Sequence, residues 1–323
     1  MFSIIIPLYN KAPYIAKAIQ SVADQTYQEF ELIIIDDGST DESLAKLRVL
    51  SSEYRDKSSE FFAKLRIVEQ KNQGVSSTRN NGVKLAKYDY IAFLDADDWW
   101  EPTFLEEMKV MIEEFPDAGI YGSSYCIVKN GNSRLACIGV EKGFTKGYID
   151  YFKTYSNSMS MPLTSITVAI PKSTFMSHYG FKTSLKLGED FDLWVRIALN
   201  HKVALLNKPL ANYNQDVDIN NRGVVHNKIY DPTTHFIFNM DYMEEHENRN
   251  PAIKQTMDLQ RIYTLMRYKR TNAFPSEFKK EINKVNFKKQ PLTVRMYYFF
   301  PSFAINFYQT VIEVLVTIKG KLK

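Results

Sequence analysis

The sequence predicts an α/β protein, in which a mostly parallel central sheet is flanked by helices and followed by a C-terminal helical extension. Apolar runs of strand length alternate with helix-length segments four times within the first 115 residues. Such alternation implies parallel strands joined by right-handed crossovers. Polar or acidic turns follow the first, second and fourth runs, so these turns are expected to share one edge of the sheet.

The first strand is expected at residues 2–8, because a continuous β-branched run suits a strand covered on both faces. Pro7 cannot donate a hydrogen bond to a neighbouring strand, so we expect pairing to stop there. Pro13 follows at a helix start, and apolar residues then recur at helical spacing as far as Val22.

The second strand, 30–35, ends in Asp36-Asp37-Gly38-Ser39. Ser39 or Thr40 is expected to cap the helix that follows. A third strand at 65–68 and a helix at 75–87, with Arg79 in its first turns, complete this part of the chain.

The fourth strand, 90–94, leads directly into Asp95-Ala96-Asp97-Asp98. Three carboxylates so close together repel one another and cost desolvation energy unless a positive group lies among them. A divalent cation such as Mg²⁺ or Mn²⁺ is the simplest neutraliser, since hard ions take oxygen ligands and share them with substrate phosphates. The alternative is an acidic turn in which Asp98 caps a helix that starts near Pro102.

Beyond residue 115 the alternation weakens. Asn130-Gly131 is a strong turn signal and predicts a hairpin. The segments expected in this part are strands at 119–128, 134–140, 164–170 and 203–206 and a helix from about 187 to 200. Glu189 and Asp190 lie at the start of that helix, where carboxylates are favoured by the helix dipole.

The length allows two domains, and we expect a first domain at 1–220, with halves at 1–115 and 116–220, followed by a helical C-terminal region at 221–323. Residues 251–323 carry 14 Lys and Arg against 4 Asp and Glu, a charge of +10 that leaves −6 on the remainder. A neutral to acidic body argues against nucleic acid as a partner. The two cysteines are expected to be reduced thiols in a cytoplasmic protein, since no secretory signal opens the chain.

The glycine-rich nucleotide-binding motifs of other α/β proteins are absent after the first strand. Instead, five segments in order resemble the family 2 glycosyltransferases, which have the GT-A fold, and they span residues 3 to about 200. The segments are Ser3 to Asn10 (SIIIPLYN), Ile35 to Asp41 (IDDGSTD), Asn72 to Asn80 (NQGVSSTRN) with Gly82, Phe93 to Asp98 (FLDADD), and Gly188 to Asp190 (GED) with Trp194 and Arg196.

The resemblance implies roles at a nucleotide-sugar site. Pro7, Tyr9 and Asn10 would line the nucleoside pocket, and Asp37 would accept a hydrogen bond from the pyrimidine. Asp36 would bind sugar hydroxyls or hold the turn, and the alternative for both aspartates is an Asx-type turn before Gly38.

The remaining donor-site roles fall on the helix at 75–87 and on the acidic stretch. Arg79 would approach the nucleotide or the acidic cluster, unless it is a surface arginine making helical ion pairs. Asp95 and the adjoining Ala96 would contact the donor, while Asp97, helped by Asp98, would hold Mn²⁺ or Mg²⁺. His226 is a further metal candidate, although a solvated loop histidine is the commoner case.

The resemblance also implies the chemistry. Asp190 would be the general base that takes the proton of the acceptor hydroxyl, with Glu189 orienting the acceptor or substituting. Direct attack on the anomeric carbon inverts its configuration. The expected reaction is transfer from a nucleotide sugar, a UDP-sugar by preference, to a glycan or lipid-linked acceptor in surface polysaccharide synthesis. The alternatives are a non-catalytic homologue that binds nucleotide sugars and a nucleotidyltransferase.

The C-terminal segment 296–323 predicts a surface-seeking helix. Residues 296–312 carry no charge, while Asn306, Gln309 and Glu313 form one polar stripe and three lysines follow. Two interpretations remain open: an amphipathic helix lying peripherally on the inner face of the plasma membrane, or a helix docked on the catalytic domain or on a second copy in a homodimer.

Overall fold

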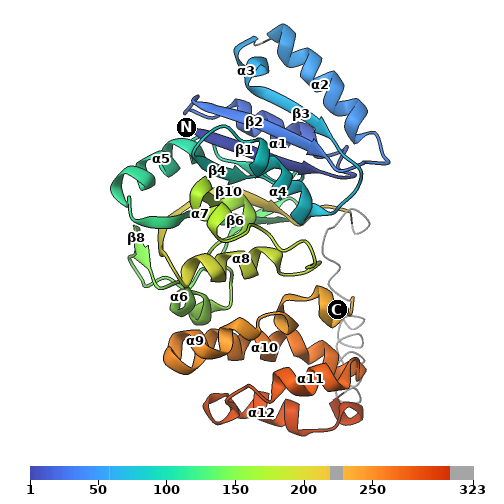
Figure 1. Cartoon of the computed structure of the whole chain (residues 1–323), viewed down its shortest axis with the longest axis vertical. Helices are drawn as coiled ribbons and strands as arrows, with labels where there is room; N and C mark the ends of the chain where they lie inside the picture. The colour runs from blue at the N-terminus through green and yellow to red at the C-terminus, as the bar shows by residue number, and fades with distance from the viewer. Residues whose placement is uncertain (58, 219–227, 306–323) are drawn as a thin grey trace, which may run out of the picture. The chain divides into compact units, whose positions relative to one another are not determined.

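Continuous apolar runs in the first hundred residues form the parallel half of one large sheet. The structure is a computed structural model, and it describes residues 1–57, 59–218 and 228–305. The chain divides into two compact units, 1–225 and 226–323. The sheet lies in the first unit with strand order β3-β2-β1-β4-β9-β6-β10-β5, and β7 and β8 pair with β6 and β10 (Figure 1).

The strands β3 (Leu65–Glu69), β2 (Phe30–Asp36), β1 (Phe2–Leu8) and β4 (Tyr90–Phe93) pair in parallel. Nearly every residue of β1 and β2 is buried. The α/β class predicted from the alternation is therefore confirmed, and the carboxyl ends of these strands meet at one edge.

Pro7 does not end the first strand, contrary to expectation. Pairing with β2 continues to Leu8 opposite Asp36, whereas pairing with β4 stops at Ile5 opposite Phe93. The backbone of Ile5 faces β4, since its carbonyl accepts a hydrogen bond from the Leu94 amide. Pro7, two residues on, faces the same side beyond the end of β4, so its missing N–H removes no hydrogen bond of the sheet.

The second half of the sheet is mixed. β9 is antiparallel to β4 and β6, and β10 is parallel to β6 and antiparallel to β5 and β8. The strands are β5 (Trp99–Trp100), β6 (Ala118–Lys129), β7 (Asn132–Leu135), β8 (Lys146–Ile149), β9 (Val168–Pro171) and β10 (Lys202–Asn214).

The hairpin predicted at Asn130-Gly131 is present as β6 and β7, but β7 ends at Leu135 rather than at residue 140. β10 is much longer than the four residues expected. It passes through Pro209, where its register against β6 shifts, as a proline inside a sheet requires.

Helices cover both faces of the sheet. α1 (Ile15–Ala23) and α4 (Val75–Leu85) lie on opposite faces, as right-handed crossovers running in opposite directions require (Figure 1). A Cβ at Gly82 of α4 would lie 2.5 Å from Ile5 Cγ2, so glycine permits this close approach to β1. The other helices of the unit are α2 (Ser43–Lys57), α3 (Ser59–Lys64), α5 (Phe104–Glu114), α6 (Tyr151–Ser158), α7 (Lys172–Ser177) and α8 (Glu189–Ala198).

Two helix starts differ from the expectation. Asp98 caps no helix: Trp99 and Trp100 pair with β10 as β5, and α5 begins only at Phe104. The helix expected near Pro102 is therefore present, but strand pairing separates it from Asp98. At α2, the side chain of Asp41, rather than that of Ser39 or Thr40, accepts a hydrogen bond from the Ser43 amide at 2.8 Å.

The second unit is helical. Arg261 lies buried in its centre and forms hydrogen-bonded ion pairs with Glu247 at 2.6 and 2.8 Å and with Glu281 at 3.2 Å. Apolar side chains such as Met257 and Leu265 pack around this cluster. The helices are α9 (Glu244–Arg249), α10 (Pro251–Thr271), α11 (Pro275–Ile282) and α12 (Leu292–Phe299), with short 3-10 turns at Pro232–Thr234, Phe236–Phe238, Asp241–Met243 and Phe287–Lys289.

Among the described residues, the structure has no helix of the length and apolarity needed to span a bilayer. The expectations for His226 and for most of the C-terminal segment, residues 306–323, lie outside the described residues.

Candidate active site

The polar turns at the carboxyl ends of β1, β2 and β4 meet at one edge of the sheet, as the strand pattern predicts. Asn10 joins the first two. It has a left-handed backbone, with φ of 52°, and its Oδ1 accepts a hydrogen bond from the Thr40 amide at 2.8 Å. Its own amide donates to Ser39 Oγ at 3.1 Å. The turn after β1 is therefore tied to the turn after β2 before any ligand binds.

Asp37 holds the loop that leads into α4. Its carboxylate accepts hydrogen bonds from the Gln73 and Gly74 amides, both at 2.8 Å, and from Gln70 Nε2 at 2.7 Å. A carboxylate has about four acceptor positions, so capacity for one further donor remains.

Asp36 is arranged differently. Its Oδ2 accepts from the Ser39 amide at 3.2 Å, as an Asx-type turn would. Its Oδ1 is buried, and among the described residues it meets no hydrogen-bond donor. A buried oxygen of this kind calls for a donor from outside the chain.

The three aspartates after β4 have three different partners. Asp95 accepts from Arg79 Nη2 at 2.6 Å, Asp97 forms an ion pair with Lys11, and Asp98 accepts from the Asn214 amide at 2.7 Å. Arg79 and Lys11 therefore neutralise part of the negative charge for which the sequence suggested a metal.

Of the three aspartates, Asp98 has the fewest partners to stabilise its negative charge. It is buried, and it receives one backbone hydrogen bond rather than a cation. Burial raises the pKa of Asp98 well above its usual range, and the charges of Asp97 and Asp95 raise it further. Burial also raises the pKa of Asp97, although Lys11 opposes this shift.

A divalent cation fits this excess of negative charge. In the described part of the chain, no three His, Cys, Asp or Glu side chains converge on one metal position. Mg²⁺ is commonly held by one or two carboxylates together with substrate phosphates, so two carboxylates, such as those of Asp97 and Asp98, would be enough from the protein.

Arg79 connects the acidic turn after β4 to the start of α8. It is buried, and its guanidinium reaches Asp95 through Nη2 and Glu189 Oε1 through Nη1 at 3.2 Å. Its Nε has no acceptor among the described residues. Burial works to lower the pKa of Arg79, but the charges of Asp95 and Glu189 outweigh burial and raise it. Its interpretation as a surface arginine is wrong.

Asp190 and Glu189 form the first turn of α8. Gly188 precedes them with φ of 77°, and the Phe191 amide donates to Asp190 Oδ1 at 2.7 Å. Burial and the neighbouring Glu189 raise the pKa of Asp190 to about 7, against the opposing effect of Arg79. A carboxyl with this pKa is suited to accept a proton near neutral pH.

The other candidate residues lie near or below this site. Tyr9 is exposed at the end of β1 and Pro7 is half-buried, whereas Ala96 is buried in the turn of the aspartates. Trp194, which belongs to the motif around Glu189 and Asp190, is fully buried in the core. Lys11 is the site residue that the sequence reasoning missed. A cation directly after the turn of β1, facing an acidic turn after β4, was the available signal.

The model of the Glycosyl transferase family 2 matches residues 3–179, more than half of the chain. The chain belongs to this family. The matched region contains the turns after β1, β2 and β4 and the helix α4, while Glu189 and Asp190 lie ten residues beyond it.

Curated relatives agree with the assignment. An uncharacterized glycosyltransferase of Rickettsia felis is 30% identical over 209 residues, and glycosyltransferase GlyA of Streptococcus pneumoniae is 29% identical over 217 residues. Each match covers 65% of this chain, but only 32% and 30% of the relatives. The chain therefore matches about a third of the length of these relatives.

Two solved structures share the fold. TarS 1–349 of S. aureus in complex with UDP-GlcNAc superposes with a TM-score of 0.58 and 20% identity, over 90% of this chain and 73% of that chain. The mannosyltransferase PcManGT of Pyrobaculum calidifontis, in complex with GDP-Man and Mn²⁺, gives a TM-score of 0.52 and 16% identity, over 91% and 77%. The architecture is accordingly of the GT-A type.

Proposed function

We propose that this protein transfers a sugar from a nucleotide-sugar donor, a UDP-sugar by preference, to a hydroxyl of a glycan or lipid-linked acceptor, with inversion. The observation that carries the proposal is the double contact of Arg79. One guanidinium reaches both Asp95, on the donor side, and Glu189, next to the candidate base. A donor site and a base so close together suit a single displacement.

The donor would lie across the turns after β1 and β2. Tyr9 and Pro7 would contact the nucleoside, Asp37 has one acceptor position left for the base, and the orphaned Oδ1 of Asp36 would accept a ligand hydroxyl. Nucleotide-sugar complexes of TarS and PcManGT support a donor of this class.

The diphosphate would lie against Asp95, Ala96, Asp97 and Asp98. Asp97 and Asp98 would hold Mn²⁺ or Mg²⁺, which stabilises the negative charge of the departing nucleoside diphosphate. Lys11 and Arg79 would position the carboxylates and supply further positive charge. The presence of Mn²⁺ in PcManGT supports this metal.

Asp190 would take the proton of the acceptor hydroxyl. The acceptor oxygen then forms a bond to the anomeric carbon on the face opposite the diphosphate, while the bond from that carbon to the diphosphate oxygen breaks and its electron pair leaves with the nucleotide. Glu189, held by Arg79, would raise the proton affinity of Asp190 and orient the acceptor. A role in surface polysaccharide synthesis completes the proposal.

The test is a screen of nucleotide sugars for metal-dependent transfer or hydrolysis, with Asp190→Asn as the diagnostic variant. Removing a general base lowers kcat by about 10²- to 10⁴-fold, while calorimetric UDP affinity should stay unchanged. Asp89→Asn, at an exposed position, is the matched control. Full activity of Asp190→Asn would refute the base assignment, and UDP binding without turnover of any donor would favour a non-catalytic binding protein.

A further inference from the structure

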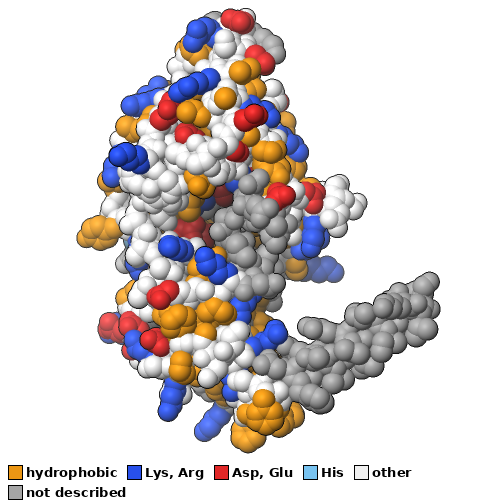
Figure 2. Space-filling view, turned by 90° about the vertical axis from the view of Figure 1, so that its right-hand side faces the viewer, with side chains coloured by type: hydrophobic (Ala, Val, Ile, Leu, Met, Phe, Trp, Pro, Cys, Tyr) orange, Lys and Arg blue, Asp and Glu red, His pale blue; other side chains and the backbone are white. Residues whose placement is uncertain are grey.

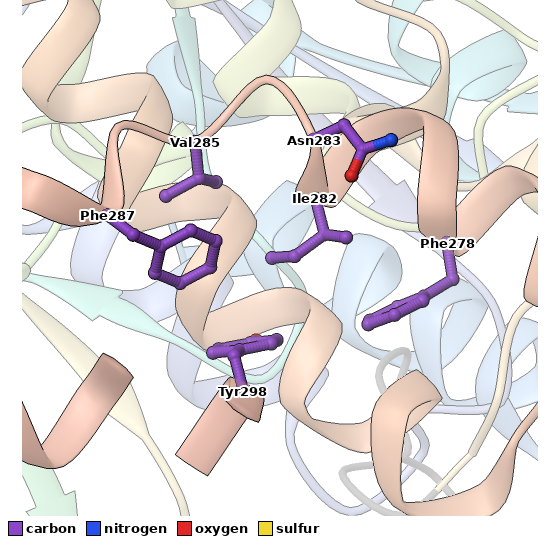
Figure 3. Close-up of a pocket in the computed structure, with 6 residues that line it drawn as sticks. All are labelled: Phe278, Ile282, Asn283, Val285, Phe287 and Tyr298. Atoms are coloured by element: carbon purple, nitrogen blue, oxygen red, sulfur yellow. The ribbon is translucent and has the colours of Figure 1, made fainter. Parts of the chain in front are cut away.

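Helix α12 packs on α10 through two tyrosines. The Tyr298 hydroxyl donates to the Ile262 carbonyl at 2.5 Å, and the Tyr297 hydroxyl donates to the Met266 carbonyl at 3.1 Å. Tyr298 also closes one side of a pocket of about 300 Å³ (Figure 3). The other residues that line this pocket come from α11 and the turn after it: Phe278, Ile282, Asn283, Val285 and Phe287. One face of α12 therefore has its partners within the unit.

The opposite face of α12 is apolar and exposed. Leu292, Met296, Phe299 and Phe303 follow one another at intervals of four, three and four residues, and their exposed fractions are 68%, 45%, 86% and 77%. The spacing of the first three places them on one face of α12, whereas Phe303 follows beyond the end of the helix at Phe299. We call these four exposed side chains together the α12 stripe. Figure 2 shows hydrophobic side chains gathered at the lower end of the helical unit. Exposed apolar groups of this size, close together along the chain, mark interaction surfaces.

The surroundings of the α12 stripe are cationic. Residues 286–305 contain Lys288, Lys289 and Arg295 and no carboxylate. The hydroxyl of Ser302 donates to the carbonyl of Lys269 at 2.7 Å, which brings the basic end of α10 beside the stripe. Within the described ranges, Lys269, Lys288 and Lys289 form no ion pair with Asp or Glu.

We propose that the α12 stripe is a membrane-binding surface. Leu292, Met296 and the two phenylalanines would enter the boundary between headgroups and acyl chains, while the surrounding lysines and Arg295 would lie against anionic lipid phosphates. Aromatic side chains framed by basic residues are the composition that peripheral membrane helices use. This inference is independent of the donor chemistry proposed above.

A second copy of the chain fits the α12 stripe less well. In a symmetric dimer the same cations would meet across the interface and repel one another. A helix of eight residues is only about 12 Å long, which is too short to bury the roughly 800 Å² per partner of a stable interface by itself. An anionic membrane surface attracts these cations instead of repelling them, and it requires no minimum interface area of this kind.

The experiment is flotation of the full chain with vesicles of phosphatidylcholine alone and of phosphatidylcholine mixed with phosphatidylglycerol. We expect binding to the mixed vesicles that falls as salt rises. Phe299→Ser/Phe303→Ser should lower the partition coefficient at least about tenfold, since two large apolar side chains are lost. Lys288→Gln/Lys289→Gln should lower it about fivefold per lysine with the anionic vesicles.

The matched control is Tyr179→Ser/Tyr263→Ser, which removes two exposed aromatic side chains elsewhere and should bind as the wild type does. The proposal is overturned if Phe299→Ser/Phe303→Ser floats as well as the wild type, or if neither vesicle binds the protein. It is also overturned if sedimentation reveals a dimer that these serine changes dissociate. Calorimetry with UDP on the same samples tests the donor site separately.

Discussion

At the scale of single residues, Asp190 links the chemistry of the site to pH. Its carboxyl lies beside Glu189 in the first turn of α8, and its pKa is raised to about 7 by burial and by that neighbour. If Asp190 is the base, kcat/KM should rise tenfold per pH unit below about pH 7 and level off above it. A flat profile between pH 5 and pH 8 would exclude this carboxyl as the base.

The same shift predicts the opposite trend for stability. The ordinary pKa of Asp190 is 3.8, so between about pH 4 and pH 7 the folded state binds more protons than the unfolded state. The contribution of this group to the free energy of unfolding therefore falls as pH rises through that window. Urea unfolding of the wild type and of Asp190→Asn at several pH values measures this contribution. The free energy of unfolding of the asparagine variant should lack the part of the pH dependence that comes from residue 190.

Lys11 is a second residue whose role is measurable. Its ion pair with Asp97 occupies a carboxylate that the metal would need. Lys11→Met should therefore bind Mn²⁺ about tenfold more tightly in the absence of donor, which titration of free Mn²⁺ by electron spin resonance reports. Lys17→Met is the control, because Lys17 lies over the Trp99 ring rather than on an aspartate. Unchanged or weaker Mn²⁺ binding by Lys11→Met would show that Lys11 does not compete with the metal for Asp97.

At the scale of elements, the close contact of α4 with β1 positions Arg79. The contact exists because residue 82 has no side chain, and a Cβ there would overlap Ile5. Gly82→Ala should lower the free energy of unfolding by about 1–3 kcal/mol, the usual cost of overpacking a core, and should weaken UDP binding as α4 shifts. Lys84→Ala, at an exposed position of the same helix, should be close to neutral. A urea midpoint for Gly82→Ala equal to that of Lys84→Ala would show that α4 and β1 accommodate the added methyl group at no cost in stability.

The elements also show where local sequence signals are weaker than pairing. Asp98 is a typical helix cap, yet Trp99 and Trp100 after it pair with Asn212 and Ala211 of β10, and the helix begins only at Phe104. Likewise β10 continues past Pro209 because β6 beside it is long and buried. Partners 85 or more residues away in sequence decided both outcomes, and a local pattern does not contain them.

At the scale of the whole molecule, one spectroscopic signal belongs to a single unit. All three tryptophans, at 99, 100 and 194, lie in the first unit, so their fluorescence reports that unit alone, whereas circular dichroism reports the helices of both units. Arg261→Met removes the buried cation that Glu247 and Glu281 share and leaves them only Lys254 and Lys284, which costs up to about 3–5 kcal/mol. We expect its circular dichroism transition to move to lower urea while tryptophan fluorescence and UDP affinity stay as in the wild type.

Arg249→Met is the matched control for that experiment. Arg249 pairs with Glu245 on the surface, and an exposed pair contributes at most about 1 kcal/mol. If Arg261→Met shifts the fluorescence transition as far as the dichroism transition, the two units unfold together.

The sequence by itself determined the α/β class, the parallel pairing of the first four strands, and the polar turns that meet at one edge of the sheet. Alternation of apolar runs and the residue types at strand ends are local properties, so they are readable along the chain. Only the tertiary structure decided which cation meets which carboxylate. Lys11 and Asp97 are 86 positions apart, and Arg79 and Glu189 are 110 apart. Such pairs depend on how strands and helices pack, and the raised pKa of Asp190 depends on burial that this packing creates.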